Sequence, residues 1–274
     1  MDSVVYNIPL SMVRTYRGRN TIVRAAESSE LVEKLSNEDL ERLSYIQILA
    51  PDREIDGLNR WEPPVPVDLL IRYPHRDLPL LYEYSPLLAR RPVRVSISAA
   101  PGFGKAVKLA ASLKLAVKLE MTQPEPGLVD ELLQIVDYYL HHSSVVQPIE
   151  FFHSLFLAFY RREQVKLWAI QEEDPSLFRY VTDQGEEVIS GRLPEVKLGA
   201  EPASFLTRLT QELMTERTEC RECDFFNCCG GYFKLPQKEF SCNGVKILFQ
   251  TLREASEELA KDFAESRVNK GESR

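Results

Sequence analysis

The chain has 274 residues, of which 44% are hydrophobic and 27% charged, with a formal net charge of −7. These values are ordinary for a globular protein and allow one large domain or two smaller ones. The acidic balance and the lack of long basic clusters argue against a nucleic-acid partner, because phosphate backbones are bound by clustered Lys and Arg. No apolar run approaches the roughly 20 residues that cross a bilayer, and no signal peptide is evident, so we expect a cytoplasmic protein without membrane contact.

Residues 1–60 show no continuous pattern. The segment VVYNIPL at residues 4–10 indicates a short strand, and residues 28–43 read as a helix. Three prolines within residues 63–66 then predict a stiff, extended connector, because each proline fixes its own φ and disfavours a helical residue before it. Residues 1–60 are therefore expected to form an N-terminal segment whose fold the sequence leaves open.

From residue 61 to residue 204, strand-like and helix-like segments alternate. The strand-like segments are short and apolar, and they are 67–73, 93–99, 116–121, 145–152 and 165–171. The helix-like segments have apolar residues at helical spacing, and they are 78–89, 105–113, 128–141, 155–160 and 176–181. This alternation predicts an α/β fold with parallel strands, which we interpret as a partial (β/α) barrel over residues 61–204. Periodicity alone does not separate a barrel from an open sheet.

The remaining residues predict a loop, two helices and a tail. Residues 183–204 are expected to be a loop with a small hairpin at Gln184-Gly185, and residues 205–217 a helix. A long helix over residues 244–263 has a 3-4-3-4 apolar stripe, Val245, Leu248, Leu252, Ala255 and Leu259. That stripe packs either on the chain's own barrel or on a partner. The polar residues 265–274 are expected to be a disordered tail.

All five cysteines lie between residues 220 and 242, after 219 residues without one. A tight group of cysteines in a cytoplasmic chain indicates metal ligation or redox chemistry, whereas secreted disulfide scaffolds spread an even number along the chain. Four of them follow the pattern Cys220-x2-Cys223-x5-Cys229-Gly-Gly-x10-Cys242. Cys228 is the spare, because adjacent side chains rarely both reach one centre. Residues 205–264 are thus expected to form a C-terminal metal-binding module.

Both zinc and a [4Fe–4S] cluster accept four thiolates. Zinc ribbons normally return with a second Cys-x-x-Cys pair, which this chain lacks. Gly230 and Gly231 follow the third thiolate, where a bulky cluster needs backbone that bends freely. Cys242 directly precedes the final helix, whose N-terminal dipole favours a negatively charged centre. The sequence therefore favours a [4Fe–4S] cluster, with zinc as the alternative.

The spacing of these cysteines resembles part of the SPASM domain, the C-terminal extension of radical S-adenosylmethionine (SAM) enzymes that mature peptides. That domain follows Cys-x2-Cys-x5-Cys-x3-Cys-gap-Cys after an upstream pair of cysteines, and it usually holds two auxiliary [4Fe–4S] clusters. The resemblance assigns the second auxiliary cluster to Cys220, Cys223, Cys229 and Cys242. Phe233 stands at the x3-Cys position and the upstream pair is absent, which implies that one cluster is retained and the other lost.

In that family a partial β/α barrel precedes the SPASM domain, and a Cys-x3-Cys-x2-Cys motif holds the cluster that cleaves SAM. This chain has no cysteine before residue 220, so the motif is missing. The resemblance therefore implies a radical-SAM-like iron–sulfur protein that lacks the SAM-cleaving cluster. It would act as a redox or substrate-docking partner in peptide or cofactor maturation, next to a peptide substrate or a peptide-modifying enzyme.

Polar residues late in the strand-like segments support a second interpretation. They are Arg72, His75, Glu120, Gln147, Glu150, His153, Gln171 and Glu172. The carboxyl ends of barrel strands carry the chemistry of β/α-barrel enzymes, so Glu120, Glu150 and His153 are candidate catalytic residues. The alternatives to an iron–sulfur partner protein are therefore a barrel enzyme of another class with a structural metal, or a zinc-stabilised adaptor.

The glycines of residues 99–105 fit a strand-to-helix turn better than a phosphate loop, because the required first glycine and Ser/Thr are absent.

Overall fold

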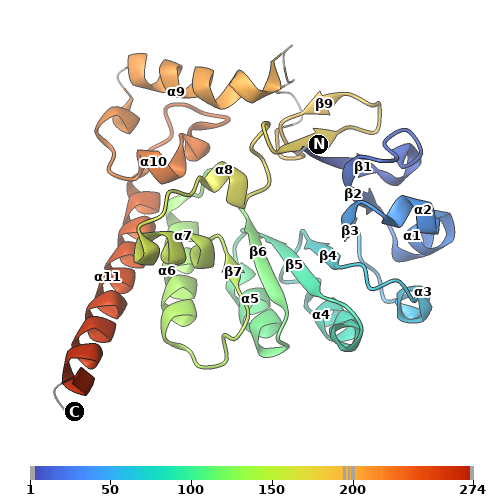
Figure 1. Cartoon of the computed structure of the whole chain (residues 1–274), viewed down its shortest axis with the longest axis horizontal. Coiled ribbons are helices and arrows are strands. Elements are labelled where there is room, and N and C mark those ends of the chain that lie inside the picture. The colour runs from blue at the N-terminus through green and yellow to red at the C-terminus, as the bar shows by residue number, and fades with distance from the viewer. Residues whose placement is uncertain (1–3, 194–195, 197, 199–200, 217, 272–274) are drawn as a thin grey trace.

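The computed structural model describes residues 4–193, 196, 198, 201–216 and 218–271. It is a mixed α/β protein built on one nine-stranded sheet in the order β7-β6-β5-β4-β3-β2-β1-β8-β9 (Figure 1). Neighbouring strands are parallel except for the antiparallel pair β8 and β9. The strands are β1 (Val5–Pro9), β2 (Asn20–Ala25), β3 (Leu43–Ile48), β4 (Val67–Ile71), β5 (Val93–Ser98), β6 (Ala116–Glu120), β7 (Ile149–Glu150), β8 (Phe178–Val181) and β9 (Glu187–Val188).

Helices connect these strands and form most of the C-terminal part. The α-helices are α1 (Ser28–Lys34), α2 (Asn37–Leu40), α3 (Asp56–Arg60), α4 (Leu78–Tyr84), α5 (Phe103–Ser112), α6 (Pro126–His141), α7 (Phe152–Arg161), α8 (Leu167–Ile170), α9 (Phe205–Thr215), α10 (Phe226–Cys229) and α11 (Asn243–Gly271). Short 3-10 turns are η1 (Leu10–Met12), η2 (Ser85–Ala89), η3 (Pro202–Ser204), η4 (Glu219–Glu222) and η5 (Tyr232–Lys234). No helix in these described ranges is long and apolar enough to cross a membrane.

The first 60 residues contribute three strands to the middle of the sheet. The strand predicted at residues 4–10 is confirmed as β1, which pairs with β2 on one side and β8 on the other. The single helix predicted over residues 28–43 is wrong in extent, because the chain becomes extended at Leu35 and Ser36 and a capping box at Ser36 starts the short α2. The sheet therefore runs across the predicted boundary at residue 60.

The alternation predicted from residue 67 is confirmed through β4, α4, β5, α5, β6, α6 and α7. Two later assignments are wrong: residues 165–171 contain the helix α8, and residues 176–181 contain the strand β8. Short apolar runs carry no distinguishing period, and β8 is extended because it pairs with the distant β1. The hairpin at Gln184-Gly185 is confirmed by the β8–β9 pair and by a φ of 86° at Gly185.

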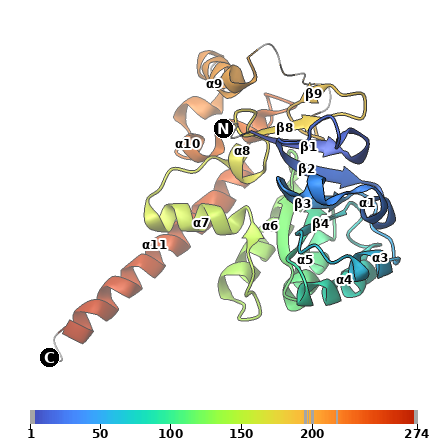
Figure 2. The same cartoon turned by 45° about the vertical axis from the view of Figure 1, so that its right-hand side comes forward.

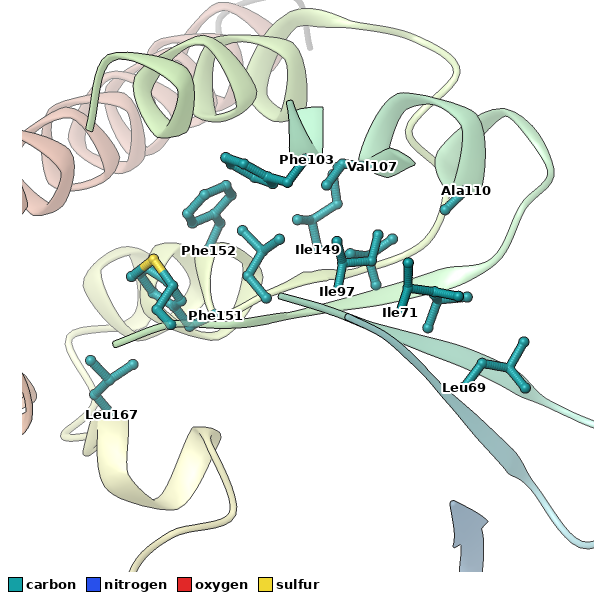
Figure 3. Packing of buried hydrophobic residues seen from close by; sticks show 14 of the residues in the cluster. Leu69, Ile71, Ile97, Phe103, Val107, Ala110, Ile149, Phe151, Phe152 and Leu167 are labelled. Atoms are coloured by element: carbon teal, nitrogen blue, oxygen red, sulfur yellow. The ribbon is translucent and has the colours of Figure 1, made fainter. Parts of the chain in front are cut away.

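One face of the sheet forms the main hydrophobic core. Figure 3 shows Leu69, Ile71 and Ile97 on the strands next to Phe103 and Val107 of α5. These five side chains are fully buried. Because side chains alternate along a strand, the residues between them point to the opposite side. That opposite side, called here the polar face, carries Asn7, Tyr45, Gln47, Asp68, Arg94, Ser96, Lys118 and Glu120.

The final helix, α11, packs on α6 and α7 through its first half and extends away from the sheet through its second (Figures 1 and 2). Leu248 and Leu252 are buried, whereas Leu259 is 36% and Phe263 51% exposed. Packing on the chain's own body is thus observed for the first half of the predicted stripe. The tail predicted to be disordered from residue 265 is helical as far as Gly271, because no glycine or proline lies between Gly244 in the first turn and that position. Residues 272–274 lie outside the described ranges, as does Arg217 of the predicted helix 205–217.

Candidate functional site

Four of the five cysteines line one small cavity in the C-terminal module. Cys220 comes from η4, Cys223 follows it, Cys229 ends α10, and Cys242 directly precedes α11. The cavity has a volume of about 20 Å³. Cys228 does not line it, and its thiol donates instead to the carbonyl oxygen of Phe225 at 3.2 Å. The four cysteines that line the cavity are therefore the four that the sequence spacing groups together, and Cys228 is left out in both cases.

The two glycines after Cys229 adopt conformations that other residues avoid. Gly230 has a φ of 58° and Gly231 a φ of 74°, both in the left-handed region. A Cβ on Gly231 would lie 2.3 Å from Cδ1 of the buried Leu213. The carbonyl oxygen of Gly230 accepts a hydrogen bond of 3.0 Å from Nε1 of Trp168 in α8. The backbone bends at these glycines and approaches Leu213 and Trp168 closely, and the hydrogen bond from Trp168 ties the module to α8.

A carboxylate organises the polar side of this cavity. Glu219 Oε1 accepts from the backbone N–H of Cys242 at 2.8 Å and from Nζ of Lys234 at 2.9 Å, and its Oε2 accepts from Nζ of Lys246 at 2.7 Å. Burial alone would raise the pKa of Glu219, but these hydrogen bonds outweigh it and lower the pKa to about 2. Two lysines therefore border the cavity, and Glu219 holds both of them in place.

Burial raises the pKa of three of the four thiols that line the cavity. Burial raises the pKa of Cys229 and of Cys242 to about 12, and it also raises the pKa of Cys220. Aromatic rings account for this desolvation, because Phe225, Phe226, Phe233 and Phe249 line the same cavity. Phe233, at the position of the missing family cysteine, is 1% exposed and packs against Phe249. Among the described residues, no group of three or more His, Cys, Asp or Glu is arranged to hold a metal ion.

A larger cavity of about 470 Å³ opens on the polar face of the sheet. Beside and beneath it lies a network of buried charges. Glu172 accepts from Arg94 at 2.9 and 3.2 Å, from Lys118 at 2.9 Å and from the hydroxyl of Tyr45 at 2.8 Å. Asp68 accepts from Arg94 at 3.1 Å, from Ser96 at 2.9 and 3.0 Å and from Gln47 at 2.9 Å. Lys118 and Arg94 hold the pKa of Glu172 well below its ordinary value, against the effect of burial.

Glu120 differs from the other carboxylates of the polar face. It lines the cavity at the end of β6 and has no hydrogen-bond or ion-pair partner in the described part of the chain. Burial raises the pKa of its carboxyl, and the charge of Lys118 only partly opposes this. A partnerless carboxyl with a raised pKa can accept or donate a proton, or it can bind a cation.

The other residues predicted from the strand ends fall into two groups. Arg72, Gln171 and Glu172 line the same cavity as Glu120. Those outside its lining are His75, Gln147, Glu150 and His153. Glu150 Oε2 accepts from the backbone N–H of Ser154 at 3.2 Å near the start of α7, and Nδ1 of His153 lies 3.0 Å from the hydroxyl of Tyr139. The structure therefore does not bring the candidates Glu150 and His153 together with Glu120 in that cavity.

A carboxylate of the chain itself binds the backbone N–H groups of the glycine turn before α5. Gly102 precedes the helix with a φ of 86°, as a strand-to-helix turn requires. The carboxylate of Glu131 accepts from the backbone N–H groups of Gly102 at 2.9 Å and of Gly104 at 2.8 Å. A side chain of α6 thus satisfies the amide groups at which an external anion would bind.

Sequence reasoning missed the residues that connect the two cavities. Tyr232 lines the polar-face cavity and its neighbour Phe233 lines the cysteine cavity, with ring centroids 5.3 Å apart. Gln123 donates to the carbonyl oxygen of Phe233 at 2.9 Å, which fixes η5 against the end of β6. The only sequence signal was that these positions lie next to the third cysteine. The two cavities are therefore neighbours, with η5 between them.

Comparison of the chain with protein-family models, with curated proteins and with solved structures finds no match in any of the three.

Proposed function

We propose that the C-terminal module binds a [4Fe–4S] cluster through Cys220, Cys223, Cys229 and Cys242, and that the protein is a redox or substrate-docking partner in peptide or cofactor maturation. The observation that carries the proposal is that these four thiols line one cavity while Cys228 does not. In this interpretation the chain is a partial (β/α) barrel followed by a SPASM-like module. The missing SAM-cleaving motif makes it a partner protein rather than a SAM-cleaving enzyme.

The donor set fits a cluster better than a single zinc ion. Four ligands of zinc converge on one point at about 2.0–2.3 Å, and no such group exists among the described residues. In a [4Fe–4S] cluster each thiolate binds a different iron, so the sulfur atoms stand farther apart around a larger centre. Four thiols that line one cavity are compatible with that arrangement, although the cavity must widen to admit a cluster. Gly230 and Gly231 lack side chains that would oppose a change of backbone conformation next to Cys229.

The charges around the cavity also suit an anionic centre. The thiols bind metal only as thiolates, and their raised pKa values mean that metal must displace the protons. Lys234 and Lys246 border the cavity, and the N-terminus of the 29-residue α11 begins at the residue after Cys242. A bound cluster supplies one-electron transfer there, and η5 separates it from the polar-face cavity. A substrate or partner at that cavity would thus lie close to the redox centre.

The test is reconstitution of the purified chain with iron and sulfide under anaerobic conditions. We expect a brown protein with broad absorption near about 400 nm and about four irons per chain. Substitution of each of the four cavity cysteines by Ser should remove the absorption and most of the iron. Cys228→Ser is the matched control and should retain both. A colourless protein that holds one zinc ion per chain, or full iron content in Cys242→Ser, would refute the proposal.

A second candidate function rests on Glu120. Its carboxyl has a raised pKa, has no partner among the described residues and lines a cavity of about 470 Å³, which is what a barrel enzyme of another class would need for acid–base catalysis. In that enzyme the cysteine module would hold a structural metal. If the chain has no catalytic activity, the remaining alternative is a zinc-stabilised adaptor. Should the purified chain convert a small molecule without a partner, Glu120→Gln would abolish that activity. Glu150→Gln, outside the cavity, would leave it unchanged.

A further inference from the structure

The polar-face cavity contains a second group whose bonding is incomplete. Arg192, which follows β9, directs only Nε to Glu173, with distances of 3.0 Å to Oε1 and 2.7 Å to Oε2. Its Nη1 and Nη2 atoms have almost no accessible surface, toward the cavity or elsewhere, and have no hydrogen-bond acceptor among the described residues. The same holds for Oγ of Ser190, two residues earlier. Both residues line the cavity.

Orphaned donors of this kind are costly, because a buried guanidinium loses its hydration without receiving acceptors in return. Aromatic rings hold Arg192 in place, with its guanidinium carbon 4.2 Å from the ring centroid of Tyr232 and 5.8 Å from that of Trp168. The position is therefore built by surrounding side chains rather than left to a mobile surface arginine. A ligand that brings acceptor atoms to this wall would complete these hydrogen bonds once the guanidinium and the Ser190 hydroxyl rotate toward the cavity.

Glu120 supplies the complementary charge within the same cavity. It lies close enough to both Tyr180 and Tyr232 for its charge to raise the pKa of each, although burial is the larger cause. Tyr232 is also the ring under Arg192, so the Glu120 carboxyl and the Arg192 guanidinium both neighbour this tyrosine. The cavity thus contains one carboxyl without an ion-pair partner and one guanidinium whose Nη atoms lack acceptors, among the described residues.

We propose that this cavity binds a zwitterion, a free amino acid or a short peptide with its ammonium on Glu120 and its carboxylate on Arg192 and Ser190. A carboxylate fits better than a phosphate because Glu173 already offsets part of the Arg192 charge, and the planar fork of the guanidinium matches two carboxylate oxygens. Apolar and aromatic side chains, including Leu70, Met121 and Phe178, line the remaining surface and suit the rest of such a molecule. This proposal stands on the polar-face cavity alone and does not depend on a cluster in the cysteine module.

The test uses the unaltered full chain and the dipeptide glycyl-phenylalanine as the probe. Binding is measured by calorimetry and by the fluorescence of Trp168 in a Trp61→Phe background, since these are the two tryptophans of the chain. We expect saturable binding of the free dipeptide, and at least about tenfold weaker binding of its N-acetylated form and of its C-terminal amide, because each loses a charge-assisted contact. No binding of the free dipeptide, or equal binding of either blocked form, would overturn the proposal.

Two substitutions then assign each end of the ligand. The acetylation penalty and the amidation penalty are the losses of affinity that each blocked dipeptide shows relative to the free dipeptide. Glu120→Gln should abolish the acetylation penalty and keep the amidation penalty. Arg192→Met should abolish the amidation penalty and keep the acetylation penalty. Glu150→Gln is the matched control outside the cavity and should keep both penalties. If Arg192→Met fails to fold, Ser190→Ala replaces it and should reduce the amidation penalty. A variant pair that changes both penalties equally would contradict the assignment. Because the readout is ligand binding and not iron content, its failure is distinguishable from failure of the proposed cluster.

Discussion

The polar face of the sheet and the cysteine module handle buried ionisable groups in opposite ways. On the polar face, Arg94 and Lys118 lie within hydrogen-bond distance of Glu172 and hold its pKa below the ordinary value, and Arg94 also forms an ion pair with Asp68. In the module, burial among phenylalanines raises the pKa of the thiols, and the nearby Lys234 and Lys246 are bound by Glu219. The chain supplies both charges of each pair in the first region. In the second, the charge of Lys234 lowers the pKa of Cys220 and Cys242 but only partly offsets the effect of burial, because Glu219 already forms an ion pair with that lysine.

The strongest test of this difference is Glu172→Gln. The substitution leaves Arg94 and Lys118 without a counter-charge in a buried setting, and we expect a loss of about 3 kcal/mol in the free energy of unfolding. Urea denaturation measures it. Glu38→Gln is the control, because its ion pair with Arg17 is exposed and should contribute nothing measurable. Equal effects of the two substitutions would mean that the polar-face network does not stabilise the fold.

The same network predicts a dependence on pH. The pKa of Glu172 is lower in the folded chain than its ordinary value of 4.5, so its contribution is complete above that pH and is lost progressively below it. The difference in stability between the native chain and Glu172→Gln should therefore be largest near neutral pH and should shrink in acid. Urea denaturation at about pH 7, 5 and 3 measures this trend. A difference that grows in acid would contradict the sign of the shift.

In the module, Gly231→Ala should cost about 2–3 kcal/mol in stability. The alanine would adopt a φ of 74°, and its Cβ would press on the buried Leu213. Gly18→Ala is the matched control, with a φ of 82° and no atom within 4 Å of the added Cβ, and it should cost about 1 kcal/mol from the backbone alone. Thermal unfolding of both variants separates the two contributions. Similar losses in the two variants would show that the added Cβ at position 231 is accommodated without strain against Leu213.

Glu120→Gln sharpens the comparison within the polar face, since it should act in the opposite direction from Glu172→Gln. Glu120 is half-buried, lines the cavity and has no ion-pair partner among the described residues, so removing its charge should raise stability by up to about 1 kcal/mol near neutral pH. Urea denaturation of the two variants under identical conditions checks the opposite signs. A loss of stability in Glu120→Gln would indicate that the carboxylate has a structural partner after all.

The last test concerns the link between the two regions. Trp168→Phe preserves an aromatic ring beside Tyr232 but removes the hydrogen bond from Nε1 to the carbonyl oxygen of Gly230. The lost hydrogen bond should cost about 1 kcal/mol, and the smaller ring at this fully buried position adds a packing cost. Hydrogen exchange should show the increase in amide exchange concentrated in the cysteine module rather than in the sheet. Exchange that rises uniformly would mean that the two regions unfold as one unit.

The sequence predicted the parts of the fold that depend on local pattern. Residues 93–141 alternate between apolar strands and amphipathic helices, and β5, α5, β6 and α6 lie where that pattern put them. The segments at 165–171 and 176–181 were assigned the wrong way round, because a short apolar run is compatible with either structure. What makes β8 a strand is its pairing with β1, more than 170 residues earlier, and local periodicity contains no information about that contact.

The candidate site divides in the same way. The spacing of the cysteines predicted which four would lie together, because a Cys-x-x-Cys loop and two glycines constrain the backbone locally. The position of Glu120 at the end of a strand predicted that it would line a cavity. Arg192 and Tyr232 gave no comparable signal, since they lie in irregular segments and meet the sheet only in the folded chain. The alternation of polar residues at Arg94, Ser96 and Ser98 indicates a polar face, because every second side chain of a strand points to the same side of the sheet.

The central place of β1 has a consequence for how the chain is made. During synthesis, β1 to β7 can pair in order as they leave the ribosome, and each needs only its predecessor. The other side of β1 stays an open edge until residues 178–181 arrive, because β8 is its second neighbour. An exposed edge strand is a template for pairing with other chains. Nascent chains that stall before residue 178 should therefore be more prone to aggregate, and addition of the β8–β9 hairpin should mark the point at which the nascent chain gains protection.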